Sequence, residues 1–332
     1  MKATAIATPN IALVKYWGKR DEKLILPMEG SIAVTMDEQL ATKTTVMFSK
    51  EFKQDEIWIN DIKMTKPDGL EKPIPQLNLI REMAEVNLRA KVVSSSTVPF
   101  AGGLAGSSAG LCALALAATT ALGLKLDKKE LSIVCRRGSG SACRSVYGGF
   151  VEWKRGEKPD GSDSHAVRIA DENHWPELRN VIVLIEKKEK KIKSRAGMKQ
   201  TVATSNLYKK RVQDLPKTLD TVRNAILQKD LPTLLEAIMR ESNNMHATML
   251  DTWPPILYLN DISKEVIYSI HEFNEGEIKA GYTFDAGPNP NIFTVERHVP
   301  EIKKILQEIG DVKEILVCKP GGKPRIVKEH LF

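Results

Sequence analysis

The chain has 332 residues, of which 42% are hydrophobic and 27% are charged, and these ordinary globular values exclude a disordered or fibrous protein. With 49 Lys and Arg against 42 Asp and Glu, the formal net charge is +7, which would suit nucleic acid, a membrane surface or a phosphorylated metabolite equally well. The length allows one large domain or two ordinary ones.

The first half of the chain is predicted to be rich in strands, because short apolar and β-branched runs alternate with turn residues. In chain order we predict strands at 32–36, 44–48 and 57–59, a helix at 76–90, a strand at 91–98, a helix from about Ser107, and a further helix with Asp127 as its N-cap.

The second half is predicted to be rich in helices. In chain order we predict strands at 150–153 and 166–170 joined by a hairpin loop, a buried strand at 181–185, helical structure from 198 to about 246, a helix at 262–273, strands at 278–284 and 292–295, a helix at 300–308 and a strand at 314–318. The change in character predicts an α+β protein with two domains, residues 1–180 and 181–332.

The cysteines and the apolar segments indicate in which cellular compartment we expect the protein. The four cysteines are widely spaced, form no CxxC pair and favour reduced thiols. The N-terminus has no long apolar segment of the secretory type, and the longest apolar stretch, 110–124, is too short to span a bilayer. We therefore expect a soluble, cytoplasmic protein with no membrane partner.

A glycine-rich loop, residues 99–110, joins a predicted strand to a predicted helix. Its glycines let the backbone approach a ligand, and free N–H groups at the helix start can bind an anion. Ser107 and Ser108 add hydroxyl groups for a phosphate or a cation. The loop has neither a Walker A ending nor Rossmann spacing. Taken alone, it fits a packing turn capped by Ser107 as well as it fits a phosphate loop.

Two further segments combine small residues with one charged group. In Gly-Ser-Gly-Ser-Ala-Cys-Arg-Ser, residues 138–145, Arg144 can bind a carboxylate or phosphate through two hydrogen bonds, although a surface arginine is the commoner interpretation. Asp285 follows an apolar strand and precedes Ala-Gly. Such an aspartate can orient or deprotonate a hydroxyl, although on this segment alone turn formation is the commoner explanation.

Basic residues gather in two places. Residues 10–21 set Lys15, Lys19 and Arg20 around two aromatic side chains. Residues 187–195 are lysine-rich, and we interpret Lys187 to Lys191 as a solvated face. Arg195 lies among small residues before a predicted helix, which suits a specific contact better.

The order of these segments resembles one family. Asn-Ile-Ala-Leu-Val-Lys-Tyr-Trp-Gly-Lys-Arg-Asp, a Gly-Leu-Ala-x-Ser loop, Gly-Ser-Gly-Ser-Ala-Cys-Arg-Ser and Tyr-Thr-Phe-Asp-Ala-Gly-Pro-Asn resemble the diphosphomevalonate decarboxylase family. This family is part of the superfamily of galactokinase, homoserine kinase, mevalonate kinase and phosphomevalonate kinase. The resemblance extends from about residue 3 to about residue 318. The lysine- and arginine-containing strings are highly specific, whereas the glycine loop identifies only the superfamily.

The resemblance implies a fold and a reaction. The N-terminal domain should be like the second domain of ribosomal protein S5, and the C-terminal domain should be ferredoxin-like. The reaction, in the mevalonate pathway of isoprenoid biosynthesis, phosphorylates the tertiary 3-hydroxyl of mevalonate 5-diphosphate at the expense of ATP. Phosphate and CO₂ then leave and isopentenyl diphosphate remains. Phosphoryl transfer needs positioning and charge neutralisation more than covalent help.

Residue roles follow from the resemblance. Asp285 should contact the 3-hydroxyl as base or orienting group, Arg144 should bind the substrate carboxylate, and Lys15 should support Asp285 or the γ-phosphate. Ser194 should lie near the reacting centre. The residues expected to hold the diphosphate are Tyr16, Lys19, Ser139, Ser141 and Arg195. The residues expected to hold ATP are Gly102, Gly103, Ala105, Gly106, Ser107 and Ser108, with Mg²⁺ on the phosphates and Ser107 as its candidate protein ligand.

Two departures from the family pattern stand out. The loop reads Ala-Gly-Ser-Ser where Ala-Ser-Ser-Ala is usual, so either serine could meet the nucleotide. Glu29 stands where Asn is common.

Several alternatives stay open. They are a decarboxylase acting on mevalonate 5-phosphate or a 3,5-bisphosphate, a 3-kinase that stops before decarboxylation, and a basic S5-like RNA-binding protein. Asp285 argues against the kinase, and Lys19 and Arg195 favour a diphosphate. No aromatic stacking motif accompanies the basic run, so we expect no nucleic acid partner. The family also implies a homodimer.

Overall fold

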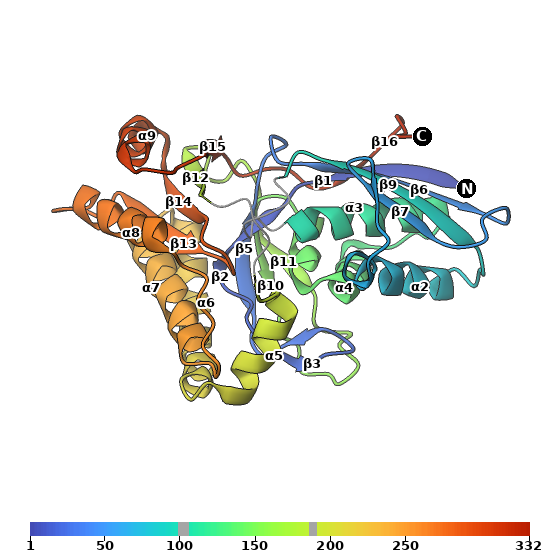
Figure 1. Ribbon diagram of the computed structural model, residues 1–332, viewed down its shortest axis with the longest axis horizontal. Coiled ribbons are helices and arrows are strands. Elements are labelled where there is room, and N and C mark those ends of the chain that lie inside the picture. The colour runs from blue at the N-terminus through green and yellow to red at the C-terminus, as the bar shows by residue number, and fades with distance from the viewer. Residues whose placement is uncertain (99–105, 186–190) are drawn as a thin grey trace.

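The computed structural model describes residues 1–98, 106–185 and 191–332. The N-terminal elements, blue to green in Figure 1, occupy one end of the elongated molecule, and most of the yellow to red elements occupy the other, whereas the last residues of the chain return to the end that holds the N-terminus. The helices are α1 (Pro67–Leu70), α2 (Pro73–Met83), α3 (Gly106–Ala121), α4 (Lys128–Gly138), η1 (Gly140–Val146), α5 (Ser194–Thr204), α6 (Tyr208–Gln228), α7 (Leu231–Leu250), α8 (Asp261–Phe273), η2 (Glu296–His298) and α9 (Val299–Glu308).

The strands form three larger sheets and one two-stranded ribbon within the described residues. In chain order they are β1 (Lys2–Ala7), β2 (Asn10–Val14), β3 (Lys19–Asp21), β4 (Leu26–Pro27), β5 (Ser31–Thr35), β6 (Thr42–Ser49), β7 (Glu56–Ile59), β8 (Ile62–Lys63), β9 (Arg89–Ser96), β10 (Phe150–Trp153), β11 (Ala166–Ala170), β12 (Leu178–Leu184), β13 (Ala280–Phe284), β14 (Pro290–Val295), β15 (Glu314–Cys318) and β16 (Arg325–Val327).

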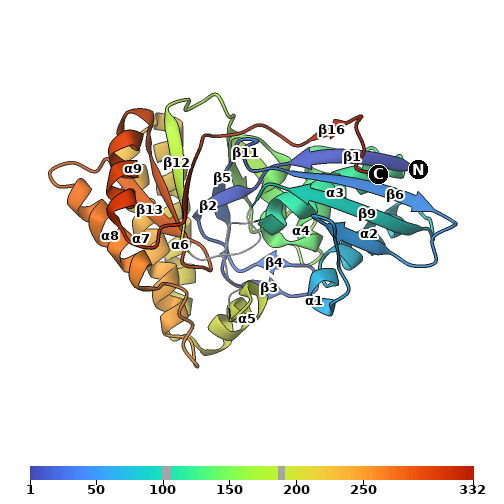
Figure 2. The ribbon, with the colours of Figure 1, turned by 45° about the horizontal axis from the view of Figure 1, so that its top comes forward.

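The N-terminal half is built around α3. This helix is apolar on almost all sides, and such a helix is stable only when it is buried. One face packs on β1 and β6 of the six-stranded sheet β16-β1-β6-β9-β7-β8, and other faces meet α2, α4 and η1. Figure 2 shows the sheet above α3 and α4. The packing fixes where the first residues of α3 and the whole of η1 lie.

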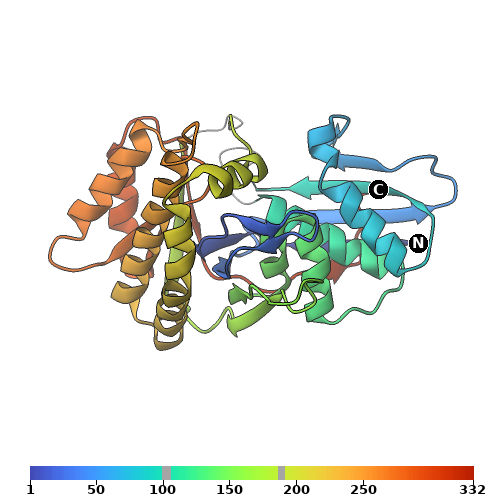
Figure 3. The same ribbon diagram turned by 90° about the horizontal axis from the view of Figure 1, so that it is seen from below.

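A second core joins the two halves of the molecule. The sheet β11-β10-β5-β2 contributes Ile32 and Phe150, the helices α6 and α7 contribute Val222 and Leu234, and the C-terminal sheet contributes Phe293. Seen from below in Figure 3, α6 and α7 run side by side next to these strands. Because one continuous core spans both halves, residues of the two halves are held at fixed distances.

The C-terminal half has the ferredoxin-like order of elements. The chain passes from β12 through helices to β13 and β14, then through α9 to β15, and the antiparallel sheet has the order β13-β14-β12-β15. Residues of β12 alternate between its two faces: Val181 and Val183 pack in the core with α8 and α9, whereas Ile182 and Leu184 pack in the core with α6 and α7.

The α+β class and the two-domain architecture are confirmed, but six strands of the described residues were missed, namely β1, β2, β3, β4, β8 and β16. β1 is alanine-rich and therefore has little strand propensity, β2 lies in a segment read for its charges, and β16 lies in a polar tail. The predicted helical run from 198 to 246 is three helices, α5 to α7, and most of the segment 138–145, including Arg144, forms the 3₁₀ helix η1.

The domain limits 1–180 and 181–332 stay a prediction. The strand β12 begins at Leu178, before that limit, and β16 pairs antiparallel with β1, so the C-terminal residues return to the N-terminal sheet. Among the described helices, none combines the length and the apolar character that crossing a membrane requires.

Candidate active site

A cavity of about 560 Å³ is lined by residues of both halves of the molecule. Its lining comes from the end of β2, the start of α3, η1, the start of α5 and the segment after β13. The described residues of the sequence-based site that line it are Lys15, Tyr16, Lys19, Gly106, Ser107, Ser139, Ser141, Arg144, Ser194, Arg195 and Asp285. The fold thus brings together segments that lie up to 270 residues apart, as the Lys15–Asp285 contact shows.

Ser108 is the one described residue of that predicted set that does not line the cavity. Ser108 is fully buried behind the cavity wall, and its hydroxyl accepts a hydrogen bond from the backbone N–H of Asn10 (3.4 Å). Gly102, Gly103 and Ala105 lie outside the described residues, as do Lys187, Lys188 and Lys190 of the lysine cluster. Lys191 is exposed, as expected of a solvated face. Glu29 is absent from the described lining, and its carboxylate accepts from the N–H of Gly30 (2.8 Å).

Lys15 and Asp285 form an ion pair at the cavity wall. Lys15 follows β2 directly and Asp285 follows β13 directly, and the Lys15 Nζ to Asp285 Oδ1 distance is 2.7 Å. The lysine side chain is 2% exposed and the aspartate side chain 24%. Burial lowers the pKa of Lys15, and the carboxylate of Asp285 opposes that shift. The carboxylate of Asp285 therefore faces the cavity, and the lysine next to it loses its proton more readily than an exposed lysine does.

Arg144 is buried on another part of the wall, within a network that fixes its direction. It lies in η1, its Nε donates to Asn10 Oδ1 (2.9 Å) and its Nη1 donates to Ser31 Oγ. The amide of Asn10 in turn donates to Ser141 O (2.9 Å) and Ser145 Oγ (2.8 Å). Burial lowers the pKa of Arg144 as well. A guanidinium held in this way is pre-oriented for an anionic ligand.

Tyr16 presents a polar atom that lacks a partner within the described part of the chain. Its ring packs edge-on against Trp153, with centroids 4.8 Å apart, and its Oη is buried without a hydrogen bond. Burial raises the pKa of Tyr16. Gly140 lies against the ring, where a Cβ would come within 2.7 Å of it, so the Ser139 and Ser141 hydroxyls can flank the tyrosine closely. A buried unpaired hydroxyl is costly and is expected to meet a ligand.

Two more cations line the cavity beside acidic neighbours. Lys19 is buried and contacts the exposed carboxylate of Glu22. Arg195, in the first turn of α5, donates to Gly138 O (3.0 Å) and lies 3.8 Å from Glu71 Oε1. Figure 2 shows α5 beside the β3–β4 ribbon that carries Lys19. Together with Tyr16 and the two serines, these cations form a region suited to an anion with several oxygens.

Another part of the lining is largely apolar, and sequence reasoning missed it. It contains aliphatic side chains of β7, α3 and the segment before α1, together with hydroxyls of β6 and β9: Ile57, Ile59, Met64, Leu111, Leu114, Thr42, Ser94 and Ser96. Alternation within the strands could predict that these residues share a face, but no motif marks them as a site. Lys72 and Lys193 also line the cavity and carried no specific signal.

Metal binding by the protein alone is not supported in the described ranges. No group of three or more His, Cys, Asp or Glu side chains is placed to hold a metal ion there. Mg²⁺ usually takes one or two protein ligands and completes its shell with phosphate oxygens and water. The hydroxyl of Ser107, in the cavity lining, fits that limited role.

The fold and the site define a class of protein. An S5-like half and a ferredoxin-like half enclose a cavity with a helix N-terminus, fixed cations and a carboxylate–lysine pair. This is the architecture of the superfamily of small-molecule kinases that includes galactokinase, homoserine kinase and mevalonate kinase.

Comparison with known families identifies the branch. The model of the diphosphomevalonate decarboxylase-like N-terminal domain matches residues 7–166, and that of the mevalonate 5-diphosphate decarboxylase C-terminal domain matches residues 180–327. The chain belongs to the diphosphomevalonate decarboxylase family, so the resemblance drawn from the motifs is confirmed.

Individual relatives agree over nearly the whole chain. A diphosphomevalonate decarboxylase of Candida albicans is 42% identical over 343 aligned positions, covering 98% of this chain and 92% of that protein. The crystal structure of mevalonate diphosphate decarboxylase from Staphylococcus aureus covers 98% of both chains at 36% identity, with a TM-score of 0.93. A structure described as "MDDEF in complex with MVAPP, AMPPCP and Magnesium" covers 99% of both chains at 37% identity, with a TM-score of 0.92.

Proposed function

We propose that this cavity binds mevalonate 5-diphosphate next to ATP and Mg²⁺ and that the chain performs the ATP-dependent decarboxylation that gives isopentenyl diphosphate, ADP, phosphate and CO₂. Family membership and the related complex with MVAPP, AMPPCP and magnesium support the substrates and the cofactor. The observation that carries the assignment of residues is the Lys15–Asp285 pair, which opens onto a cavity that also holds the oriented guanidinium of Arg144.

Asp285 orients the 3-hydroxyl and accepts its proton as the γ-phosphoryl group is transferred. Its carboxylate is the exposed partner of the ion pair, and Lys15 holds it in place and offsets its charge. Lys15 is close enough to the same centre to contact the transferred phosphoryl group. Mg²⁺, when bound, neutralises phosphate oxygens. Ser194, at the start of α5, lines the same region and is proposed to contact the reacting centre.

Arg144 binds the carboxylate of the substrate. Holding this group fixes the C–C bond in line with the departing 3-phosphate, so that electrons from that bond fill the positive character left at the tertiary carbon. Its hydrogen bonds to Asn10 and Ser31 keep the guanidinium from turning away.

The diphosphate occupies the region of Tyr16, Lys19, Ser139, Ser141 and Arg195. The unpartnered Oη of Tyr16 supports this placement, because a phosphate oxygen would accept its hydrogen bond. The cations now beside Glu22 and Glu71 would turn to the more highly charged ligand.

ATP is proposed to lie with its phosphates at the start of α3, near Gly106 and Ser107, and its adenosine against the apolar lining. Gly102, Gly103 and Ala105 remain part of the proposed phosphate loop by resemblance. Ser107 rather than Ser108 faces the cavity, so we assign the nucleotide or metal contact to Ser107 and a packing role to Ser108.

One assay distinguishes this function from its alternatives. The protein is incubated with ATP, Mg²⁺ and each of mevalonate, its 5-phosphate and its 5-diphosphate, and ADP and CO₂ are measured together. We expect equal amounts of ADP and CO₂ with the diphosphate. ADP without CO₂ would show a kinase, and preference for the monophosphate would identify the other decarboxylase. Absence of turnover together with tight, salt-dependent RNA binding would support the S5-like binding protein.

The homodimer, the cytoplasmic location and the absence of a nucleic acid partner are proposed as well. The four cysteines are buried free thiols, which supports a reducing compartment. Lys193 and Arg195 of the basic run line the cavity instead of forming part of an open basic face. Sedimentation analysis of the purified chain, with and without RNA, tests the dimer and the last point.

A further inference from the structure

Lys15 and Asp285 directly follow edge strands of two different sheets. β2, which ends just before Lys15, is at the edge of the sheet β11-β10-β5-β2, and β13, which ends just before Asp285, is at the edge of the sheet β13-β14-β12-β15. Strand pairing alone therefore does not fix the separation of the two side chains. Helix α7 contacts both β2 and β13.

Two consecutive residues of α7 hold the two strands. The carboxylate of Glu241 accepts a hydrogen bond from the backbone N–H of Lys15 (N to Oε1, 2.8 Å). The hydroxyl of Ser242 accepts one from the backbone N–H of Phe284, the residue before Asp285 (N to Oγ, 2.9 Å). Each edge strand thus has an N–H group, at or beside the reacting pair, that is satisfied by a side chain of α7.

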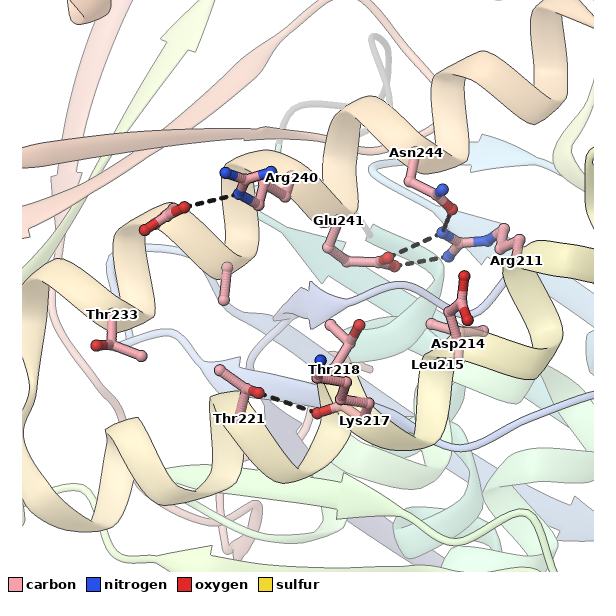
Figure 4. Close-up of a pocket in the computed structure, with 12 residues that line it drawn as sticks. Arg211, Asp214, Leu215, Lys217, Thr218, Thr221, Thr233, Arg240, Glu241 and Asn244 are labelled. Atoms are coloured by element: carbon pink, nitrogen blue, oxygen red, sulfur yellow. Dashed lines mark hydrogen bonds and ion pairs between the residues drawn. The ribbon is translucent and has the colours of Figure 1, made fainter.

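The carboxylate of Glu241 is itself held in place by a residue of the neighbouring helix. Arg211 of α6 donates from Nη2 to Oε1 (2.6 Å) and from Nη1 to Oε2 (2.8 Å), and its Nη1 also donates to Asn244 Oδ1 (2.6 Å). Figure 4 shows this ion pair beside a second cavity, of about 360 Å³, between α6 and α7. The Arg211 and Glu241 side chains are 1% and 3% exposed. Burial of such a pair gives little net stability, so stability alone does not explain it.

We propose that Glu241 and Ser242 are positioning residues that hold Lys15 against Asp285, and that Arg211 acts through Glu241. This inference rests on the proposed function, in which Lys15 and Asp285 act together on the substrate. Neither Glu241 nor Ser242 lines the substrate cavity described above, so both act through the backbone of the reacting residues.

The charge of Glu241 has a second effect. Burial lowers the pKa of Lys15, and the charge of Arg144 lowers it too, whereas the charges of Asp285 and Glu241 raise it. His246 of α7, also near Lys15, is neutral near pH 7 because burial lowers its pKa to about 4. Loss of the Glu241 charge should therefore lower the pKa of Lys15 further, and the alkaline limb of the rate profile should move to lower pH.

Double variants of the buried Arg211–Glu241 pair distinguish the effect of positioning Lys15 from the effect of the charge of Glu241. The variant Arg211→Met with Glu241→Leu removes the charges and the acceptor for the Lys15 N–H, whereas Arg211→Met with Glu241→Gln removes the charges but keeps an amide oxygen. We expect the first to lower kcat by about 10²-fold with little change in KM, because a small misplacement of reacting groups has effects of that size. The second should recover kcat to within about tenfold of the parent, on the same scale. Both should shift the alkaline limb to lower pH.

Matched variants make the result decisive. Glu236→Gln removes a surface pair with Arg240 on the same helix (2.7 Å, 49% and 78% exposed) and should change neither kcat nor the pH profile. A normal kcat and alkaline limb in the apolar double variant would overturn the proposal. If that variant does not fold, Ser242→Ala decides: kcat should fall about tenfold at unchanged KM, again from misplacement, and an unchanged kcat would overturn the proposal. Asp285→Asn, measured alongside, separates the two claims, because full activity of that variant would remove the proposed function of the pair itself.

Discussion

Two ion pairs of almost equal length in the described part of the chain do different things. Lys15 and Asp285 share one contact of 2.7 Å, and a quarter of the aspartate side chain is open to the cavity. Arg211 and Glu241 share two contacts of 2.6 and 2.8 Å and are closed to solvent. The first pair has a carboxylate that can still bind a ligand, whereas the groups of the second pair are already bound to other protein groups. An ion pair that faces a cavity with incomplete partners is therefore the better indicator of chemistry.

The largest effect is expected for Asp285→Asn, at the pair that faces the cavity. The amide cannot accept the proton of the 3-hydroxyl, and it leaves Lys15 without its counter-charge, so both ADP and CO₂ formation should fall by roughly 10²- to 10⁴-fold, the range for loss of a general base. The fold and ATP binding should persist, because the side chain is partly exposed. Coupled assays of ADP and CO₂, with nucleotide binding followed by fluorescence, check this. An active variant would remove Asp285 from its proposed role.

The closed pair should respond in stability as well as in rate. Glu241→Ala leaves the guanidinium of Arg211 buried without a counter-charge, and the free energy of unfolding should drop by about 3–5 kcal/mol. Urea unfolding of the variant and the parent measures this. Glu236→Gln, at the exposed pair on the same helix, should stay within about 0.5 kcal/mol of the parent. A loss in Glu241→Ala no larger than in this control would mean that the pair contributes nothing to the fold.

The difference between the two pairs also explains which parts of the site could be predicted from sequence. Asp285 and Arg144 lie in short strings that contain glycine or serine, and those strings carried the family resemblance. Glu241 and Arg211 lie in ordinary amphipathic helices, where a glutamate and an arginine 30 residues apart look like surface residues. Only the crossing of α6 and α7 makes them partners.

The fold, like the site, has parts that could be predicted from sequence and parts that could not. Elements with a strong local signal were predicted nearly to the residue: the strands 150–153, 166–170 and 314–318, and the helix after Asp127. Strands whose stability comes from distant partners were missed. β2 is a row of five buried residues between two other elements, and β16 is held by pairing with β1. The apolar part of the cavity was missed for the same reason, because its side chains come from separate strands and a helix.

His246 is a titratable group close to the Lys15–Asp285 pair. Its Nε2 is buried with no partner among the described residues, its ring packs against Phe284, and its pKa falls from 6.5 to about 4, first through burial and then through Lys15. The unfolded chain therefore binds a proton at this histidine more readily than the folded one. Stability should be lost as the pH falls from about 6.5 to 4, by up to about 3 kcal/mol.

The variant His246→Gln isolates this contribution. Its free energy of unfolding should fall less than that of the parent between pH 7 and pH 4, and the difference between the two slopes gives the histidine's share. Urea titrations at half-unit pH intervals provide the data. Parallel pH dependence of the two proteins would show that His246 titrates normally in the fold.

The smallest expected effect comes from a site that serves neither pair. Asp127 caps α4 in a reciprocal arrangement, in which its Oδ1 accepts from the N–H of Glu130 and Glu130 Oε2 accepts from the N–H of Asp127, both at 2.8 Å. Asp127→Ala should lower the free energy of unfolding by about 1 kcal/mol. Arg144 follows α4 in η1, but its orientation depends on Asn10 and Ser31, so kcat per folded molecule should not change. A fall in kcat with this variant would mean that mild destabilisation by itself slows the reaction, and the rate losses expected at Glu241 and Ser242 could then no longer be assigned to the position of Lys15 and Asp285.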